Sequence, residues 1–227
     1  MLGDQLPDRS PSSSPTPRGP RRRGTVRPAL VEAGVALARA GGPDAVVLRE
    51  VTRAVGVVPN AAYRHFTDRD ALLAAVRDEA LTLLALRMAD GMSKVRAGAH
   101  TATGARQRLR AVGEAYLAFA REEPGLFDTA FAAAHPGPEA TGNAEEPKPF
   151  DHLQSALNNL VEAGVLAPKR RPVIEYPVWA TVHGMAMLLR GPLDAETDAD
   201  KRALEAQALG FIGSAVTLGA DPARATT

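Results

Sequence analysis

The most informative part of this chain is residues 56–66, which read Gly56-Val57-Val58-Pro59-Asn60-Ala61-Ala62-Tyr63-Arg64-His65-Phe66. It follows a short segment of helical periodicity, 48–55, and precedes a longer one that begins at Asp68. Gly56 lies where a left-handed or otherwise tight turn is needed, and Pro59 suits the first turn of a helix because no intrahelical partner awaits its missing N–H. The pattern therefore predicts two short helices, 48–55 and 60–66, joined by a glycine turn.

Helical periodicity continues on both sides of this hairpin. Apolar residues recur at helical spacing over 28–40, and again from Asp68, whose carboxylate can cap exposed amide donors, toward Met92. Further helices are expected at 106–122, 124–134, 150–164, 173–190 and 200–219. Since the sequence shows no convincing β alternation and no internal repeat, we expect an all-α fold.

Composition narrows the class of protein. The chain of 227 residues has no cysteine, which excludes disulfides, thiolate metal sites and thiol nucleophiles. The first twenty residues lack the apolar core of a signal peptide, and the longest uncharged apolar run, 176–189, is shorter than the roughly 20 residues of a membrane span. We therefore expect a soluble, cytoplasmic protein with no membrane partner.

Charge is distributed unevenly along the chain. Residues 1–87 hold 13 Lys and Arg against 9 Asp and Glu, a net charge of +4, and the remainder carries −3. A basic front and an acidic back suggest a head that binds a polyanion on a body that does not.

The hairpin fits a helix-turn-helix, whose second helix can enter the major groove of DNA. Many helical hairpins share this spacing, but the residues quoted above, followed by Asp68-Arg69-Asp70-Ala71-Leu72-Leu73, resemble the DNA-binding domain of the TetR family over Leu30 to Val76. The resemblance implies packing positions at Ala54, Val57, Ala62, Phe66, Leu72 and Leu73, and positions facing DNA at Arg49, Pro59, Asn60, Ala61, Tyr63, Arg64, His65 and Arg69.

The chemistry of the DNA-facing set agrees with the resemblance. Asn60 can pair bidentately with an adenine edge, Arg64 can reach guanine or phosphate, and Ala61 is small enough to touch a thymine methyl. Tyr63 and His65 can donate to phosphate, as can Arg69 near the start of the next helix. The alternative for Tyr63 is a core aromatic. The sequence departs from the family at Val58, where a Ser or Thr often caps the recognition helix.

The N-terminal segment 1–24 is rich in Pro and Ser and is expected to be a disordered basic tail. Its run Arg21-Arg22-Arg23 is interpreted as an arm along phosphates or in an adjacent minor groove, with an ordinary solvated charge run as the alternative.

The C-terminal half contains a Trp-x-x-x-His-Gly pattern beginning at Trp179, with Glu123-Pro124-Gly125-Leu126-Phe127 upstream. From about residue 117 to 211 this resembles the C-terminal domain of the TetR subgroup named WHG after those three residues. The helix around Trp179 and the last helix, with its stripe Leu204, Ala208, Phe211, Ala215 and Leu218, are expected to form half of a homodimer interface, or else both stripes are intramolecular core.

A pocket for a small-molecule effector is predicted inside this half. Pockets are mostly apolar with a few polar anchors, and such a set is available here. The predicted lining comprises Phe119, Phe127, Phe131, Trp179, His183 and Met187. In the alternative interpretation His183 is a satisfied core histidine and Met187 fills a gap.

These observations predict a tail at 1–24, a helix-turn-helix domain of three helices at 25–72, a helical ligand-binding and dimerisation domain at 73–220, and a disordered tail at 221–227. The expected function is a repressor released from a double-stranded DNA operator by a ligand, with an activator or a ligand-independent DNA-binding protein as alternatives. No enzyme motif is found, the five histidines lack metal-ligand spacing, and no cofactor is expected.

Overall fold

The computed structural model describes residues 26–132 and 148–217, and within these two ranges the chain is helical with no strand. The elements in chain order are α1 (Val26–Gly41), η2 (Pro43–Ala45), α2 (Leu48–Val55), α3 (Pro59–Tyr63), α4 (Arg69–Ser93), α5 (Ala102–Glu122), α6 (Pro124–Ala130), α7 (Pro149–Glu162), η3 (Pro168–Arg170), α8 (Glu175–Arg190) and α9 (Asp198–Thr217). The predicted all-α class is confirmed.

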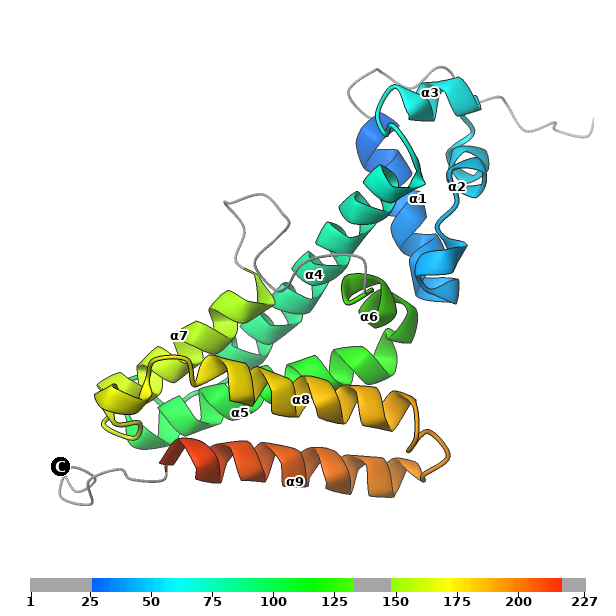
Figure 1. Cartoon of the computed structure of the whole chain (residues 1–227). Coiled ribbons are helices and arrows are strands. Elements are labelled where there is room, and N and C mark those ends of the chain that lie inside the picture. The colour runs from blue at the N-terminus through cyan, green and yellow to red at the C-terminus, as the bar shows by residue number, and fades with distance from the viewer. Residues whose placement is uncertain (1–25, 133–147, 218–227) are drawn as a thin grey trace, which may run out of the picture.

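The long helix α4 connects the two halves of the molecule (Figure 1). One end packs against α1 in a head built from α1, α2 and α3, and its other end packs against α5 in a body that also contains α7, α8 and α9. Asp68 caps α4 as predicted, because its carboxylate accepts a hydrogen bond of 2.8 Å from the Ala71 amide. The same hydrogen bond is the main reason that the pKa of Asp68 is lowered.

The short helix α6 joins head to body by packing against both α1 and α4. A Cβ atom added at Gly125, in the first turn of α6, would overlap the backbone carbonyl of Ala38 in α1. Gly34 of α1 approaches Val76 of α4 with similarly little room. The hydrophobic core consequently runs without interruption from the head into the body.

Two expectations for the head were wrong in detail. Helix α3 was expected to continue to residue 66 but ends at Tyr63, because the amides of His65 and Phe66 both bond to the carbonyl of Ala62 and close the helix into a turn. Phe66 thereby reaches the core, where its side chain is 3% exposed. Ala54, a predicted packing position, is exposed on α2, whereas the other predicted packing positions are buried or packed against the core.

Candidate functional site

The turn between α2 and α3 sets the geometry of the head. Gly56 caps α2 in the left-handed conformation, with φ of 72°, as its position in the sequence predicted. Its amide donates to the Arg53 carbonyl, and the next amide, of Val57, donates to the Thr52 carbonyl. Since both donors at the helix end are satisfied locally, the turn holds α3 at a fixed angle to α2.

Helix α3 divides cleanly into a buried and an exposed face. Ala62 is fully buried against the core, whereas Pro59, Asn60, Tyr63 and Arg64 are exposed. The side chain of Tyr63 is 55% exposed, so its interpretation as a core aromatic is wrong. Two further predicted positions, Ala61 and His65, are partly buried at the edge of this face. The face offers an amide, a phenol and a guanidinium to solvent.

The N-terminus of α3 lacks a side-chain cap. Val58 occupies the cap position with φ of −70° and ψ of 146°, makes no side-chain hydrogen bond and is 70% exposed. The missing side-chain cap that Val58 implies in the sequence is therefore also found in the structure. An exposed valine there covers no core and satisfies no amide.

The arginines predicted to face DNA differ in their surroundings. Arg49 is exposed on α2. Arg69 donates to the carbonyls of Val46 at 2.9 Å and Pro43 at 2.7 Å, and so ties the start of α4 to the segment before α2. This intramolecular role competes with the phosphate contact expected for Arg69. The predicted arm, 21–23, lies outside the described residues.

An aromatic cluster occupies the body at the site where the sequence predicts a pocket. Phe127, Phe131, Trp179 and His183 surround Tyr116, whose ring centroid lies 5.2 Å from that of Trp179 and 5.6 Å from that of Phe127. The Tyr116 hydroxyl lies 2.8 Å from Nδ1 of His183. Four of the six predicted lining residues are thus brought together, around a tyrosine that the prediction missed. The apolar spacing of Tyr116 with Val112 on α5 was the available signal.

Burial fixes the protonation of the Tyr116–His183 pair. It lowers the pKa of His183 and raises the pKa of Tyr116 well above its usual range. The imidazole is therefore neutral and the phenol keeps its proton, and the two side chains share one hydrogen bond whose direction follows the imidazole tautomer. This arrangement is a satisfied internal hydrogen bond, as the alternative interpretation of His183 holds.

The remaining two predicted lining residues lie elsewhere. Phe119 is buried on α5, with the Arg87 guanidinium 5.6 Å from its ring centroid. Met187 is 49% exposed on α8. A helix that is apolar nearly all round gives no sequence signal for which apolar face turns inward, and the prediction placed Met187 on the wrong one.

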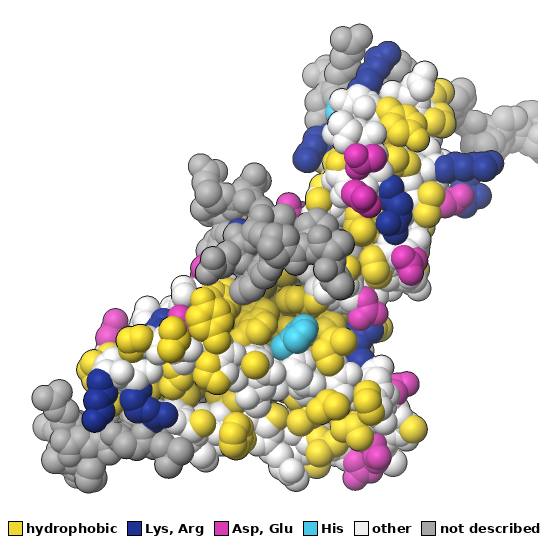
Figure 2. Space-filling model, viewed as in Figure 1, with side chains coloured by type: hydrophobic (Ala, Val, Ile, Leu, Met, Phe, Trp, Pro, Cys, Tyr) yellow, Lys and Arg dark blue, Asp and Glu magenta, His cyan; other side chains and the backbone are white. Residues whose placement is uncertain are grey.

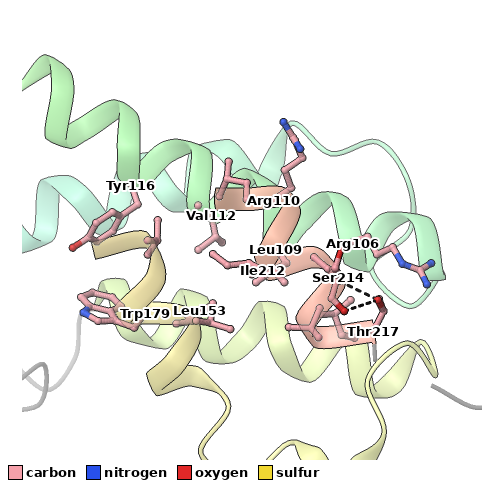
Figure 3. A pocket seen from close by; sticks show the side chains of 18 of the residues that line it. Arg106, Leu109, Arg110, Val112, Tyr116, Leu153, Trp179, Ile212, Ser214 and Thr217 are labelled. Atoms are coloured by element: carbon pink, nitrogen blue, oxygen red, sulfur yellow. Dashed lines mark hydrogen bonds between the residues drawn. The ribbon is translucent and has the colours of Figure 1, made fainter. Parts of the chain in front are cut away.

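The body contains a cavity of about 360 Å³ between α5, α7, α8 and α9 (Figure 3). Of the predicted pocket residues only Trp179 lines it, together with Tyr116. Most of the other lining side chains are aliphatic, and two arginines of α5, Arg106 and Arg110, complete the wall. The volume falls within the range of small-molecule sites.

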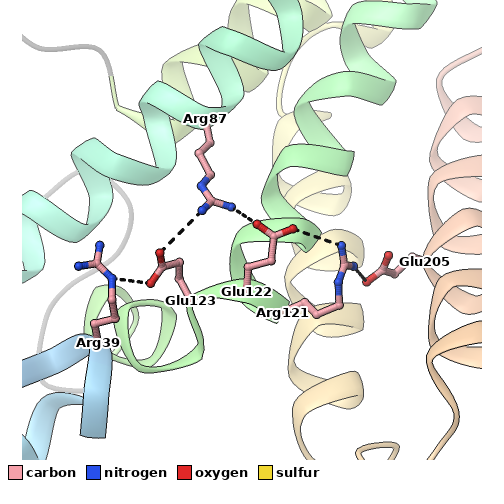
Figure 4. A network of polar contacts seen from close by, with 6 residues as sticks. All are labelled: Arg39, Arg87, Arg121, Glu122, Glu123 and Glu205. Carbon is pink, nitrogen blue, oxygen red and sulfur yellow. Dashed lines mark hydrogen bonds and ion pairs between the residues drawn. The ribbon is translucent and has the colours of Figure 1, made fainter. Parts of the chain in front are cut away.

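A polar network crosses the molecule from head to body (Figure 4). Arg39 of α1 pairs with Glu123 at 2.7 Å, and Arg87 of α4 contacts both Glu123, at 3.7 Å, and Glu122, at 2.5 Å. The network continues through Arg121 of α5, whose guanidinium lies 2.6 Å from the Glu205 carboxylate of α9. It connects four helices of the head and body.

Apolar side chains are exposed on the outer helices of the body. Tyr176, Met187 and Leu188 of α8 and Phe211 of α9 are 44–65% exposed. In the view of Figure 2, apolar side chains spread over the body and basic side chains are prominent on the head. Since α8 buries Val178 and Val182 on its inner side, it is apolar on two faces in a single chain.

Neither membrane spans nor metal clusters are found in the described ranges. None of the helices there is both long enough and apolar enough to cross a bilayer. Within the same ranges, His, Asp and Glu side chains form no group of three that could hold a metal ion.

A helix-turn-helix with an exposed polar second helix, carried on a helical body, defines the class of helical DNA-binding regulators. Two family models match the chain: residues 30–76 match the bacterial regulatory proteins of the tetR family, and residues 109–211 match the tetracyclin repressor-like C-terminal domain. The chain therefore belongs to the TetR family, and it is a DNA-binding transcriptional regulator and not an enzyme.

Solved structures share this fold at low sequence identity. A protein of unknown function from Rhodococcus sp. RHA1 is 22% identical, with a TM-score of 0.64 over 89% of this chain and 100% of that one. A TetR-family regulator from Pectobacterium atrosepticum is 19% identical, with a TM-score of 0.60 over 88% and 97%. PfmR, a TetR-family regulator from Thermus thermophilus, is 17% identical, with a TM-score of 0.52 over 85% and 98%. Among curated proteins, no sequence matches the chain significantly.

Proposed function

We propose that this regulator is a homodimeric repressor that leaves its operator when a small molecule binds the body. The observation that carries the proposal is the exposed face of α3, where Asn60, Tyr63 and Arg64 point away from a packed core. Polar side chains on the second helix of a helix-turn-helix are the ones that reach base edges and phosphates.

Within this proposal the head, 25–72, reads DNA and the remainder, 73–220, dimerises and binds the effector. Asn60 pairs with an adenine edge and Arg64 with guanine or phosphate. Tyr63, His65 and Arg49 contact phosphates. Assignment of the C-terminal half to the WHG subgroup is part of the same proposal.

The structure offers a route by which the body acts on the head. Helix α4 belongs to both halves, and α6 packs against α1 and α4 together. An effector that favours one body conformation therefore shifts the position of the head by its differential affinity for the two states. The ion pair of Arg39 with Glu123 lies at this junction.

The direction of regulation is tested by transcription in vitro. DNA bound by the chain is selected from a random pool and placed at a promoter, and single-round transcript is measured with rising protein concentration. We expect the transcript to fall, because a bound dimer occludes polymerase. A rise would establish an activator instead.

The same template tests the effector. Restoration of transcript by a small molecule that binds the body supports ligand release. If a ligand with demonstrated binding leaves both the transcript and the operator affinity unchanged, the chain is a ligand-independent DNA-binding protein.

A further inference from the structure

We propose that the cavity between α5, α7, α8 and α9 binds a linear amphipathic monocarboxylate, with its apolar chain inside the cavity and its carboxylate at Arg106. The regulatory consequence of binding rests on the proposed function, whereas the binding itself does not. The site differs from the aromatic pocket predicted from the sequence. Trp179 is the one predicted lining residue that borders the cavity.

The interior of the cavity suits a saturated chain. Its wall is formed mainly by aliphatic side chains, among them Leu109, Val182 and Ile212, each of which is at most 6% exposed. No Asp or Glu is among its lining residues, all of which belong to the described part of the chain. An apolar chain is stabilised there in proportion to the apolar area that it removes from water.

The shape of the cavity favours an extended ligand over a compact one. Figure 3 shows Tyr116 and Trp179 toward one end and Arg106, Ser214 and Thr217 toward the other. Arg106 and Tyr116 lie on the same helix, and at the helical rise of about 1.5 Å per residue their separation along α5 is ~15 Å. A linear molecule can span this length with its two ends in different environments.

The charge at the polar end selects an anion. Arg106 is exposed and pairs with no carboxylate in the described ranges. The neighbouring Arg110 is engaged by Glu114 at 2.7 Å, so Arg106 is the uncompensated cation of the wall. The Ser214 hydroxyl lies at the same end and can donate to a second carboxylate oxygen. A carboxylate there forms charge-assisted hydrogen bonds.

The single tryptophan of the chain makes the site observable. Trp179 is the only tryptophan among the 227 residues, and it lines the cavity. Dodecanoate, kept below its micellar concentration, is titrated into the full chain while tryptophan fluorescence is recorded. We expect a saturable change in intensity, and a weaker affinity for dodecanol, which has the same chain without the charge.

Two variants locate the ligand. Arg106→Gln should weaken dodecanoate binding about threefold to fivefold, as expected for one partly exposed ion pair, and should leave dodecanol binding unchanged. Arg202→Gln is the matched control, because Arg202 is an exposed arginine of α9 that does not line the cavity. Gly213 lines the cavity and a Cβ there meets no atom within 4 Å, so Gly213→Leu should fill part of it and abolish the fluorescence change.

The outcomes separate the site from the regulation. The site would be overturned if Gly213→Leu binds dodecanoate like the wild type. It would also be overturned if Arg106→Gln and Arg202→Gln weaken binding equally. Absence of binding to the full chain would overturn it too. Normal binding with unchanged operator affinity would uphold the site and overturn ligand release alone.

Discussion

On α3, side chains that pack into the core can be distinguished by their exposure from side chains that are free to contact DNA. Ala62 is fully buried, whereas its neighbours Asn60 and Tyr63 are exposed. Truncation of a largely exposed side chain changes stability little, usually within about 0.5 kcal/mol. Losses of DNA affinity in variants at Asn60 or Tyr63 can therefore be attributed to lost contacts with DNA.

At Val58 we expect a substitution to stabilise the head. Its backbone already has the extended conformation of a cap, and its side chain is 70% exposed, so Val58→Ser gains a hydrogen bond to an α3 amide at little cost in packing. The free energy of unfolding should rise by about 0.5–1 kcal/mol, measured by urea denaturation. Val58→Ala is the control without a hydroxyl, and an equal gain in that variant would contradict the explanation.

Stability should depend on pH through His183. Because burial lowers its pKa in the folded chain below the ordinary 6.5, the unfolded chain takes up the proton first as the pH falls. The contribution of the neutral histidine is therefore fully present above about pH 6.5 and is lost progressively below it. His183→Gln should be less stable than the wild type at about pH 8, since Tyr116 loses its hydrogen bond to the imidazole, but should lose less stability on going to about pH 5.

Urea unfolding of both proteins at the two pH values checks this expectation. The pKa of His152 is also lowered by burial, but this residue is present in both proteins, so its effect cancels in the comparison. Equal losses of stability in the wild type and in His183→Gln would show that His183 does not carry the dependence.

Among the elements, α6 packs so closely against α1 that its first turn has no room for a further side-chain atom. A Cβ at Gly125 would overlap backbone atoms of α1, which cannot move like a flexible side chain. Gly125→Ala should therefore destabilise the chain by about 1–3 kcal/mol, the usual cost of overpacking, measured by urea denaturation. Gly184→Ala in α8, where a Cβ meets no atom within 4 Å, should instead raise stability by about 0.5–1 kcal/mol. A mild effect at Gly125 would show that α6 is free to shift against α1.

The elements were also what the sequence predicted best. Periodicity, the Asp68 cap and the Gly56 turn located the helices of the head, since these signals are local. Periodicity did not show how far α3 extends, because its end depends on the docking of Phe66 in the core. Nor did it locate the cavity, whose wall combines residues of five helices, α4, α5, α7, α8 and α9, that only tertiary packing brings together. The face of α8 that carries Met187 was misassigned for the same reason.

In the whole molecule, the exposed apolar side chains of α8 and α9 are expected to pair with those of a second copy. Phe211 is 65% exposed, and a charge there would be buried without a partner in an isologous interface. Phe211→Arg should therefore convert a dimer into a monomer in sedimentation velocity. Ala206→Arg, at an exposed position on a different side of α9, should leave the dimer intact. A wild type that sediments as a monomer, or an unchanged Phe211→Arg dimer, would contradict this interface.

Whether α3 reads DNA is tested by binding to DNA flanking the chain's own gene, or selected from a random pool, across a salt series. The wild type is compared with the double variant Asn60→Ala, Tyr63→Ala, after both are shown to unfold at similar urea concentrations. We expect tight, sequence-preferring binding that weakens steeply with salt in the wild type and is lost in the variant. Equal binding by the two folded proteins would contradict it.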